Sequence, residues 1–157
     1  LTNTSGVKVG ITRKTQKITR WIDQGASQAV LVAEVPNRRL SGLIELELKK
    51  TLSDRTNWRK MLTNENDPVD LKEAYKIGIE NLPSDLKDYV RSEKPEIKNL
   101  KYPVNKYPEK VNSLKLEKEV RYKGKLTGIK GQYLIFEDQS VFNVRSNEGK
   151  VVEIEIN

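Results

Sequence analysis

The sequence predicts an α+β fold, in which a small mixed sheet flanked by helices is followed by a helical connector and a C-terminal antiparallel β unit. Three observations support this class. Two strand patterns near the start of the chain are each followed by a helical pattern. A middle segment is rich in proline and lysine. The last part has short apolar runs separated by glycines, which is typical of antiparallel strands. We place the three parts at residues 1–62, 63–112 and 113–157.

The first part opens with a turn and a strand. Residues 3–6, Asn-Thr-Ser-Gly, favour a turn, so we expect residues 1–2 to end a strand that lies upstream or is incomplete. Residues 7–11 alternate with a period of two, which predicts the next strand. Residues 15–24 then carry a helical pattern, and Gly25 is the residue expected to end that helix.

A second strand and helix follow. Residues 29–35 form a nearly continuous apolar run, which predicts a buried strand that Pro36 stops. Asn37 is a favoured N-cap residue for a helix over residues 38–52. The apolar positions expected on one face of this helix are Leu40, Leu43, Ile44, Leu48 and Leu52.

The middle of the chain is predicted to be helical before it becomes extended. Helical patterns cover residues 58–62 and 69–81, and the second is expected to turn Leu71, Ala74, Tyr75 and Ile79 inward. Pro83 restarts a helix that reaches about residue 91. Residues 92–111 predict an extended connector.

Four strands are predicted in the last part, at residues 116–126, 133–136, 141–144 and 151–156. The turns between them contain Asp138-Gln139 and Asn147-Glu148-Gly149. The aromatic side chains Tyr122, Tyr133 and Phe136 are expected to pack in the core rather than to stack on bases. We interpret this unit, a small barrel or sheet, as a structural or substrate-shaping module.

The positive charge of the chain is concentrated at one end. Net charge is +7. Residues 1–62 hold 12 Lys or Arg against 5 Asp or Glu, whereas residues 63–112 hold 9 against 10 and residues 113–157 hold 8 against 7. This asymmetry predicts a site for nucleic acid or another polyanion in the first part. The alternative interpretation is a solvated basic surface.

Composition excludes several kinds of chemistry. Histidine and cysteine are absent, which excludes disulfides, thiol nucleophiles, Ser-His-Asp triads and ordinary zinc sites. No apolar run approaches the roughly 20 residues that cross a bilayer, and no secretory signal is visible, so we expect a cytoplasmic protein that does not enter a membrane. Because the first residue is Leu1 rather than Met, we expect an N-terminus that is processed, truncated or incompletely recorded.

Three residues of the first part suit phosphodiester hydrolysis. Arg20 lies on the first predicted helix and would stabilise charge on phosphoryl oxygens. Glu45 lies on the second and would hold a divalent metal ion, Mg²⁺ or Mn²⁺, that polarises the phosphate. Asn57 would order the carboxylate or the substrate through its amide.

This order of parts resembles the GIY-YIG nuclease superfamily over about residues 1–60. The segment Lys8-Val9-Gly10-Ile11-Thr12 is similar to the second signature strand, with Gly10 at its glycine. The resemblance implies that the arginine, glutamate and asparagine of the nuclease site correspond to Arg20, Glu45 and Asn57. Two tyrosines of the family have no counterpart, since Val9 occupies the position of one and the other is not in the visible sequence.

A wider part of the chain resembles an uncharacterised bacterial family. The stretches VGITRKTQKITRWIDQGAS, VPNRRLSGLIELELKK, TNWRKML and GIKGQYLIF carry this resemblance. From the charge asymmetry and the nuclease-like order of parts we expect a nucleic-acid-binding protein with a GIY-YIG-like core. Cleavage of phosphodiesters with Mg²⁺ or Mn²⁺ is the activity that the nuclease resemblance implies. The alternatives are a catalytically inactive interaction module for nucleic acid or protein and a binder of a small phosphorylated ligand.

Each candidate residue also has a purely structural interpretation. Glu45 is spaced to pair with Lys49 at i,i+4, and Asn57 is placed to cap the next helix. Glu47 is expected on the surface of its helix, and the two tryptophans, Trp21 and Trp58, are expected in the core. The side chains expected to contact phosphates are Lys8, Arg13, Lys14, Lys17 and Arg20.

Overall fold

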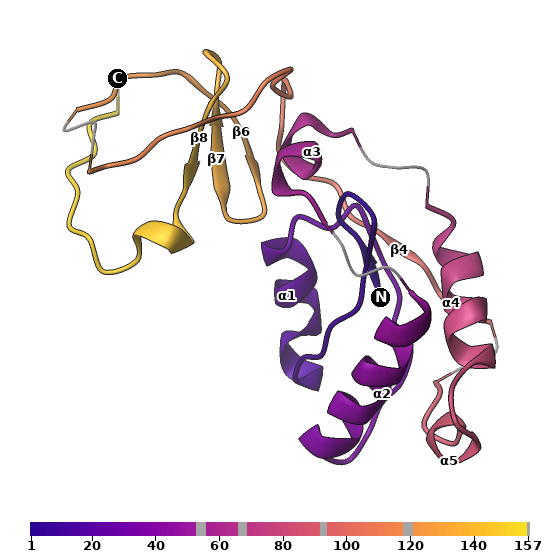
Figure 1. Ribbon diagram of the computed structural model, residues 1–157. Coiled ribbons are helices and arrows are strands. Elements are labelled where there is room, and N and C mark those ends of the chain that lie inside the picture. The colour runs from indigo at the N-terminus through magenta and orange to yellow at the C-terminus, as the bar shows by residue number, and fades with distance from the viewer. Residues whose placement is uncertain (53–55, 66–68, 92–93, 118–120, 157) are drawn as a thin grey trace.

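A computed structural model describes residues 1–52, 56–65, 69–91, 94–117 and 121–156. It has two lobes, each built on a four-stranded sheet (Figure 1). The first lobe carries the larger helices and contains the first part of the chain together with much of the predicted connector. The second lobe is almost entirely strand and loop. The α+β class predicted from the sequence is therefore confirmed.

The first sheet is antiparallel throughout, in the order β2-β1-β3-β4. Its strands are β1 (Thr2–Asn3), β2 (Val7–Lys8), β3 (Gln28–Ala29) and β4 (Lys98–Asn99). A mixed sheet was expected because a helix connects β2 to β3. These two strands do run in the same direction, but β1 lies between them and pairs antiparallel with both. No parallel pair therefore forms in this sheet.

The strand that pairs with β2 in the hairpin is β1, at the start of the chain. Thr2 pairs with Lys8 across the hairpin. Leu1 and Val30 extend the ladder, since each donates its backbone N–H group to the carbonyl of the other at 2.8 and 2.9 Å. Asn3, which was expected to begin the turn, is a strand residue. The tight turn that follows is closed by a bond from Thr4 N to Gly6 O at 3.2 Å.

The predicted helices all form in the structure. They are α1 (Lys17–Asp23), preceded by the 3₁₀ turn η1 (Lys14–Gln16), α2 (Arg38–Thr51), α3 (Trp58–Thr63), α4 (Leu71–Glu80) and α5 (Ser84–Lys87). Gly25 ends the α1 region with a left-handed φ of +69°, and Asn37 caps α2 by accepting from Leu40 N at 3.0 Å. Among the described residues, no helix is both long and apolar enough to span a bilayer.

The core of the first lobe lies between its sheet, α2 and α4. Ile44 and Leu48 of α2 are buried in it. Gly78 of α4 lets the two helices approach, because a Cβ atom there would lie 2.8 Å from Cδ2 of Leu48. Leu43 was expected on the buried face of α2 but is 41% exposed. Residues 71–90 belong to this core, so the predicted connector is an integral part of the first lobe.

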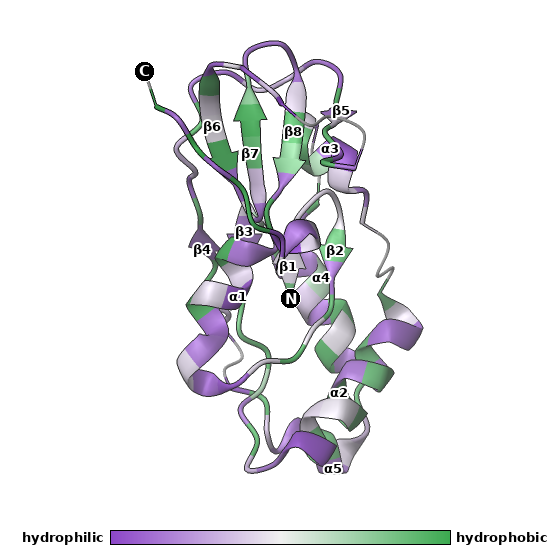
Figure 2. Ribbon diagram, turned by 90° about the vertical axis from the view of Figure 1, so that its left-hand side faces the viewer, coloured by the Kyte–Doolittle hydropathy of each residue, from purple (hydrophilic) through white to green (hydrophobic). Residues whose placement is uncertain are grey.

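The second sheet has the order β5-β8-β7-β6 and is mixed. Its strands are β5 (Asn112–Ser113), β6 (Leu126–Lys130), β7 (Tyr133–Phe136) and β8 (Ser140–Asn143). Three of them form an antiparallel meander, in which hydrophobic residues are prominent (Figure 2), and β5 joins β8 in parallel. The strands predicted at 133–136 and 141–144 are confirmed.

Two strand predictions in the second lobe are wrong. The strand expected at 116–126 forms at Leu126–Lys130 instead, and residues 118–120 lie outside the described residues. Gly128 helps to set this register, since a Cβ atom there would lie 2.8 Å from Cα of Val104, which crosses it. Residues 151–156 alternate like a strand, but they pair with no described strand and their side chains are exposed.

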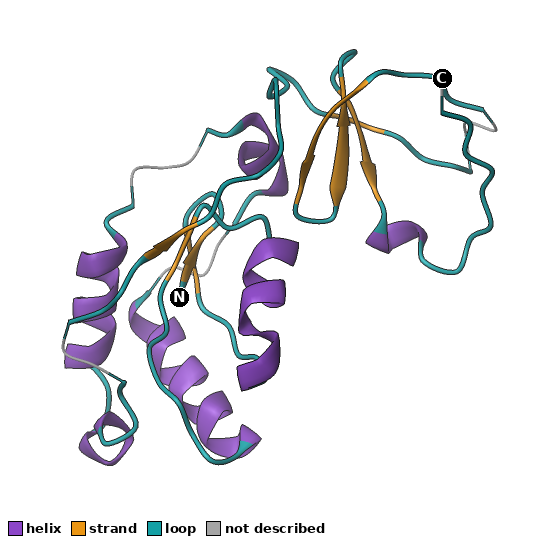
Figure 3. Cartoon of the chain, turned by 180° about the vertical axis from the view of Figure 1, so that it is seen from behind, coloured by secondary structure: helices purple, strands orange, loops and turns teal. Residues whose placement is uncertain are grey.

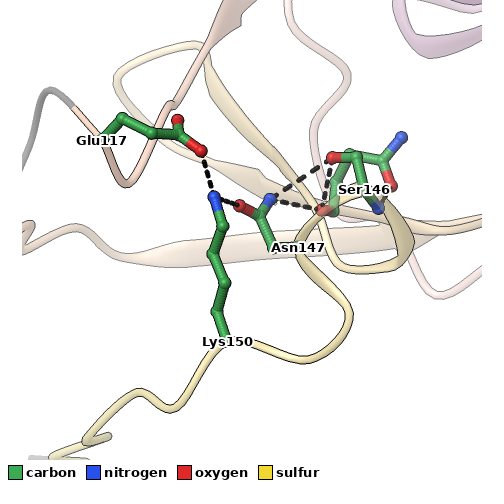
Figure 4. A network of polar contacts seen from close by, with 5 residues as sticks. Glu117, Ser146, Asn147 and Lys150 are labelled. Carbon is green, nitrogen blue, oxygen red and sulfur yellow. Dashed lines mark hydrogen bonds and ion pairs between the residues drawn. The ribbon is translucent and has the colours of Figure 1, made fainter.

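A polar network closes the end of the second lobe (Figure 4). The 3₁₀ turn η2 (Arg145–Asn147) follows β8. Asn147 Nδ2 donates to Asn143 O at 2.8 Å and to Ser146 Oγ at 3.3 Å. Lys150 Nζ donates to Asn147 Oδ1 at 3.2 Å and also to Glu117. Through these polar contacts the network holds the segment after β5 against the turn after β8.

A buried lysine joins the two lobes. Lys130, at the end of β6, is 1% exposed. Its ammonium donates to Met61 O at 2.8 Å and to Asn64 Oδ1 at 3.1 Å, so it caps the C-terminal end of α3. It also lies 5.1 Å from the ring centre of Tyr107 and 5.8 Å from that of Tyr102. α3 lies between the lobes in the ribbon views (Figure 1, Figure 3).

Other contacts lock the same junction. Gly131 has a φ of +59°, and a Cβ atom there would lie 3.0 Å from Asp23 O, so the β6–β7 turn sits tightly on the end of α1. Trp58 of α3 stacks on Tyr133 of β7 with ring centres 5.5 Å apart. Tyr102 O–H donates to Ala26 O at 3.0 Å. The second lobe is therefore fixed on α1 and α3.

The charge on Lys130 should make stability depend on pH. Burial lowers the pKa of Lys130 from 10.5 to about 8. Between these values the unfolded chain binds a proton that the folded protein has released, so the free energy of unfolding rises with pH. Relative to Lys130→Met, we expect the unaltered protein to gain about 3 kcal/mol between pH 8 and 10.5. Urea denaturation of both proteins across this range measures the gain.

The comparison with Lys130→Met removes the effects of other titrating groups. Burial also raises the pKa values of Tyr102 and Tyr107 above 10, so both rings remain largely neutral through most of this range. A constant difference between the two proteins from pH 8 to 10.5 would contradict a buried, partly desolvated ammonium.

Candidate functional site

A cleft of about 570 Å³, here called the main cleft, opens between α1 and α2. Residues 9–14 and 30–37 form its base, and Lys17 and Trp21 of α1 form one wall. The opposite wall belongs to α2 and consists of Arg38, Ser41, Ile44, Glu45 and Leu48. The two helices lie apart in the ribbon view (Figure 2).

A second depression of about 20 Å³, the small hollow, adjoins the main cleft. It lies between the β1–β2 hairpin and α1, and its polar lining includes Thr2, Lys8, Arg20 and Gln24. The two depressions share Leu1, residues 10–12 and Trp21. The ring of Trp21 is buried, as expected for a core residue, and it separates the two depressions.

The five cations predicted to contact phosphates divide between these depressions. Arg13, Lys14 and Lys17 line the main cleft, whereas Lys8 and Arg20 line the small hollow. Arg38, which sequence reasoning did not single out, adds a cation on the α2 wall. We call the surface that carries Lys8, Arg13, Lys17, Arg20 and Arg38 the basic face.

The cations of the basic face are not held in close ion pairs among the described residues, although, after the hydrogen bond from Lys14, the charge of Lys17 also contributes to lowering the pKa of Glu34. Within the described part of the chain, none of these five side chains forms an ion pair with an aspartate or glutamate. Lys14 differs, because it pairs with Glu34 on the base of the main cleft, and Arg91 lies 3.8 Å from the same carboxylate. The hydrogen bond from Lys14 holds the pKa of Glu34 below its ordinary value. Lys14 is therefore less available to a phosphate than the sequence suggested.

Glu45 lines the main cleft and also makes its predicted structural contact. Its carboxylate accepts from Lys49 at 3.1 Å, one turn along α2. In the described residues, no three His, Cys, Asp or Glu side chains lie close enough together to hold a metal ion. Glu45 fits Mg²⁺ or Mn²⁺ only as a single protein ligand that phosphate oxygens and water would complete. Glu47, expected on the surface, is partly exposed, lines neither depression and pairs with Lys50 at 2.6 Å.

Asn57 lies away from both depressions. Its Oδ1 caps α3 by accepting from Arg59 N at 2.9 Å and Lys60 N at 3.4 Å. Its backbone N–H donates to Ser5 Oγ at 2.7 Å, in the turn of the β1–β2 hairpin. This turn is at the opposite end of β2 from Gly10 and the main cleft. The structure therefore brings Arg20 and Glu45 to adjoining depressions without Asn57.

The structure also shows the surroundings of Val9 and of the strand residue before it. Val9, which the sequence comparison put in place of one tyrosine, is 3% exposed and belongs to the core. The strand residue that shares the small hollow with Arg20 is Lys8, and Thr2 is paired with it on the neighbouring strand. Thr2 Oγ1 is buried with no hydrogen-bond partner in the described structure. A lysine and a threonine thus line the small hollow together with the arginine.

Sequence reasoning missed Glu34, Arg38 and Ser41 as lining residues. Glu34 lies in the apolar run that predicts a strand, two residues before Pro36, so the sequence indicated only that it is near the end of that strand. Arg38 and Ser41 are three residues apart, and Ser41 and Glu45 are four apart. This spacing places all three on one face of a helix, and it was the available signal that Arg38 and Ser41 accompany Glu45. It shows which residues share a helix face, but not that the face borders a cleft.

Comparison with known proteins identifies a family and no activity. Residues 1–152 match a family model described as protein of unknown function (DUF2797). No curated protein and no solved structure matches the chain. The resemblance to an uncharacterised family is therefore confirmed, whereas the resemblance to a nuclease core receives no support from these comparisons.

The Glu34 ion pair makes a prediction for polyanion binding. Glu34→Gln removes the partner of Lys14, so we expect the variant to elute from a heparin column at a higher salt concentration than the unaltered protein. Glu47→Gln is the matched control, because it removes the same charge from a glutamate outside both depressions. If the two variants elute at the same salt concentration, the net charge of the protein alone determines heparin binding. That result would contradict the claim that the ion pair with Glu34 makes Lys14 less available to a polyanion.

Proposed function

The chain belongs to the DUF2797 family, whose members are proteins of unknown function, and we propose that its basic face binds nucleic acid through the backbone phosphates. The observation that carries this proposal is the gathering of Lys8, Arg13, Lys17, Arg20 and Arg38 along two adjoining depressions, without a carboxylate partner among the described residues.

Electrostatics supports a polyanion rather than a single small anion. The cations extend from the small hollow, past Trp21, to the α2 wall of the main cleft, so they come from the hairpin, α1 and α2. A row of cations suits a chain of phosphates, because each phosphate that is neutralised releases condensed counterions and so increases the affinity. The excess positive charge of the chain also lies wholly in residues 1–62, which carry this face. Nucleic acid is the polyanion that such a basic stripe indicates.

Cleavage of the bound nucleic acid is the second candidate function. The observation behind this candidate is that Arg20 and Glu45 line two depressions that share Trp21. Arg20 would stabilise charge on the phosphoryl oxygens, and Glu45 would hold Mg²⁺ or Mn²⁺ together with phosphate and water. The alternatives are an inactive module for nucleic acid or protein and a binder of a small phosphorylated ligand.

Removing two cations of the main cleft should weaken binding in a salt-dependent way. We expect Arg13→Ala with Lys17→Ala to lower affinity for a 20-base-pair DNA of any sequence and to reduce the slope of log Kd against log salt by about two. Fluorescence anisotropy at several salt concentrations measures the slope. Adding Lys14→Ala should change it further by less than one, because Lys14 is paired with Glu34.

A second pair of lysines provides the control for this experiment. Lys72 and Lys76 are exposed on α4, outside both depressions. Their replacement by alanine removes the same two charges and should leave the slope nearly unchanged. Equal effects of the two double variants, or no DNA binding by the unaltered protein at low salt, would refute the assignment of the basic face.

Cleavage can be tested separately with labelled single- and double-stranded DNA and RNA in Mg²⁺ or Mn²⁺. If the protein cleaves, Arg20→Ala should lower turnover by about 10²–10³, and Glu45→Gln should abolish metal-dependent activity without unfolding the protein. Glu47→Gln should have little effect, since its partner is Lys50 outside the depressions. No cleavage by the unaltered protein would remove the hydrolytic candidate and leave the binding proposal standing.

A further inference from the structure

The main cleft has an apolar base that phosphate binding alone does not require. Buried side chains of Val9, which follows β2, and of Val30 and Val32, which follow β3, border it, and those of Ile44 and Leu48 border it from α2. A phosphate carries its own hydration and interacts with cations at a surface. An apolar base is instead the usual feature of a pocket that takes a planar or hydrophobic group.

The charged groups of the main cleft stand around this base. Arg13 and Lys17 lie on the side of β2 and α1, and Arg38 lies at the first turn of α2. A ligand that places its apolar part on the base would therefore have cations within reach on both sides. This combination matches a nucleotide, whose base is planar and whose phosphate is anionic.

The size of the main cleft matches one such group. Its volume of about 570 Å³ lies within the roughly 300–1,000 Å³ typical of pockets for small ligands. Gly10 at its edge leaves additional room, because a Cβ atom there would meet nothing within 4 Å. A base inside a duplex is paired and stacked, so it must leave the helical stack to reach the cleft.

We propose that the main cleft holds the base of one unpaired nucleotide of a nucleic-acid strand, while the basic face holds the adjoining phosphates. This inference rests on the proposed function and adds the form of the ligand. A base in a duplex must break its pairing and stacking before it enters, whereas a base of a single strand does not. Single-stranded nucleic acid is therefore the preferred ligand.

Filling the main cleft tests the proposal. Ser41 lies on the α2 wall, and its hydroxyl donates only within the helix, to Arg38 O at 2.8 Å. In Ser41→Phe the ring would occupy space that the base needs. The matched control is Leu43→Phe, which adds a ring on the same helix at a partly exposed residue outside both depressions. Circular dichroism and thermal unfolding check that both variants fold.

The probes are a ten-nucleotide deoxyadenylate strand, its duplex with thymidylate, and deoxyadenosine monophosphate as a competitor. We expect the unaltered protein and Leu43→Phe to bind the single strand roughly five- to a hundred-fold more tightly than the duplex, with competition by the mononucleotide. Ser41→Phe should lose this preference and the competition, yet keep duplex binding with the same salt dependence, because its cations are unchanged.

The outcomes separate this inference from the proposed function. Binding of both DNA forms with equal affinity by the unaltered protein, or an undiminished preference in a folded Ser41→Phe, would overturn the unpaired-base proposal and leave phosphate binding intact. Binding of neither DNA form would overturn the proposed function itself. Binding of the mononucleotide without either DNA would overturn both, since the cleft would then serve a free small molecule.

Discussion

The buried ammonium of Lys130 is the interaction on which the arrangement of the two lobes depends. It is held by the carbonyl of Met61 and the side-chain amide oxygen of Asn64, and no carboxylate accepts from it among the described residues. Burial lowers the pKa of this ammonium, so its two hydrogen bonds offset part of the cost of removing the charge from water. The same β6–β7 turn rests on the end of α1 through Gly131. The second lobe therefore fixes α1, and with it the wall of both depressions that carries Lys17 and Arg20.

The basic face follows from how the remaining charges of the first lobe are distributed. Glu34 and Glu45 both line the main cleft, but each already has a lysine partner, Lys14 and Lys49. The arginines and lysines on either side of them keep their charge without such partners among the described residues. Cations therefore outnumber carboxylates along the two depressions, and a concave surface with an excess of one sign attracts a ligand of the opposite sign. The apolar base of the main cleft then adds a preference that charge alone does not provide.

Local signals allowed the helices to be predicted, whereas pairing between distant segments could not be. Asn37 and Asn57 cap their helices as expected because capping depends on a few adjacent residues. Three features depend instead on contacts between segments that are far apart in the sequence. These are the position of β1 between β2 and β3, the formation of a strand at Leu126–Lys130 and the burial of Lys130. For the site, composition indicated which cations are present. Only the fold shows that Lys14 is paired with Glu34 and that Asn57 lies away from both depressions.

The most direct test of the account is to map where a nucleic-acid strand lies on the protein. Hydrogen–deuterium exchange of the full chain, with and without a saturating deoxyadenylate strand, reports this without a mutation. The account predicts that the strand slows exchange in residues 10–17, in residues 30–38 and in the first half of α2. Protection confined to the second lobe, or spread evenly over exposed lysines of both lobes, would contradict it.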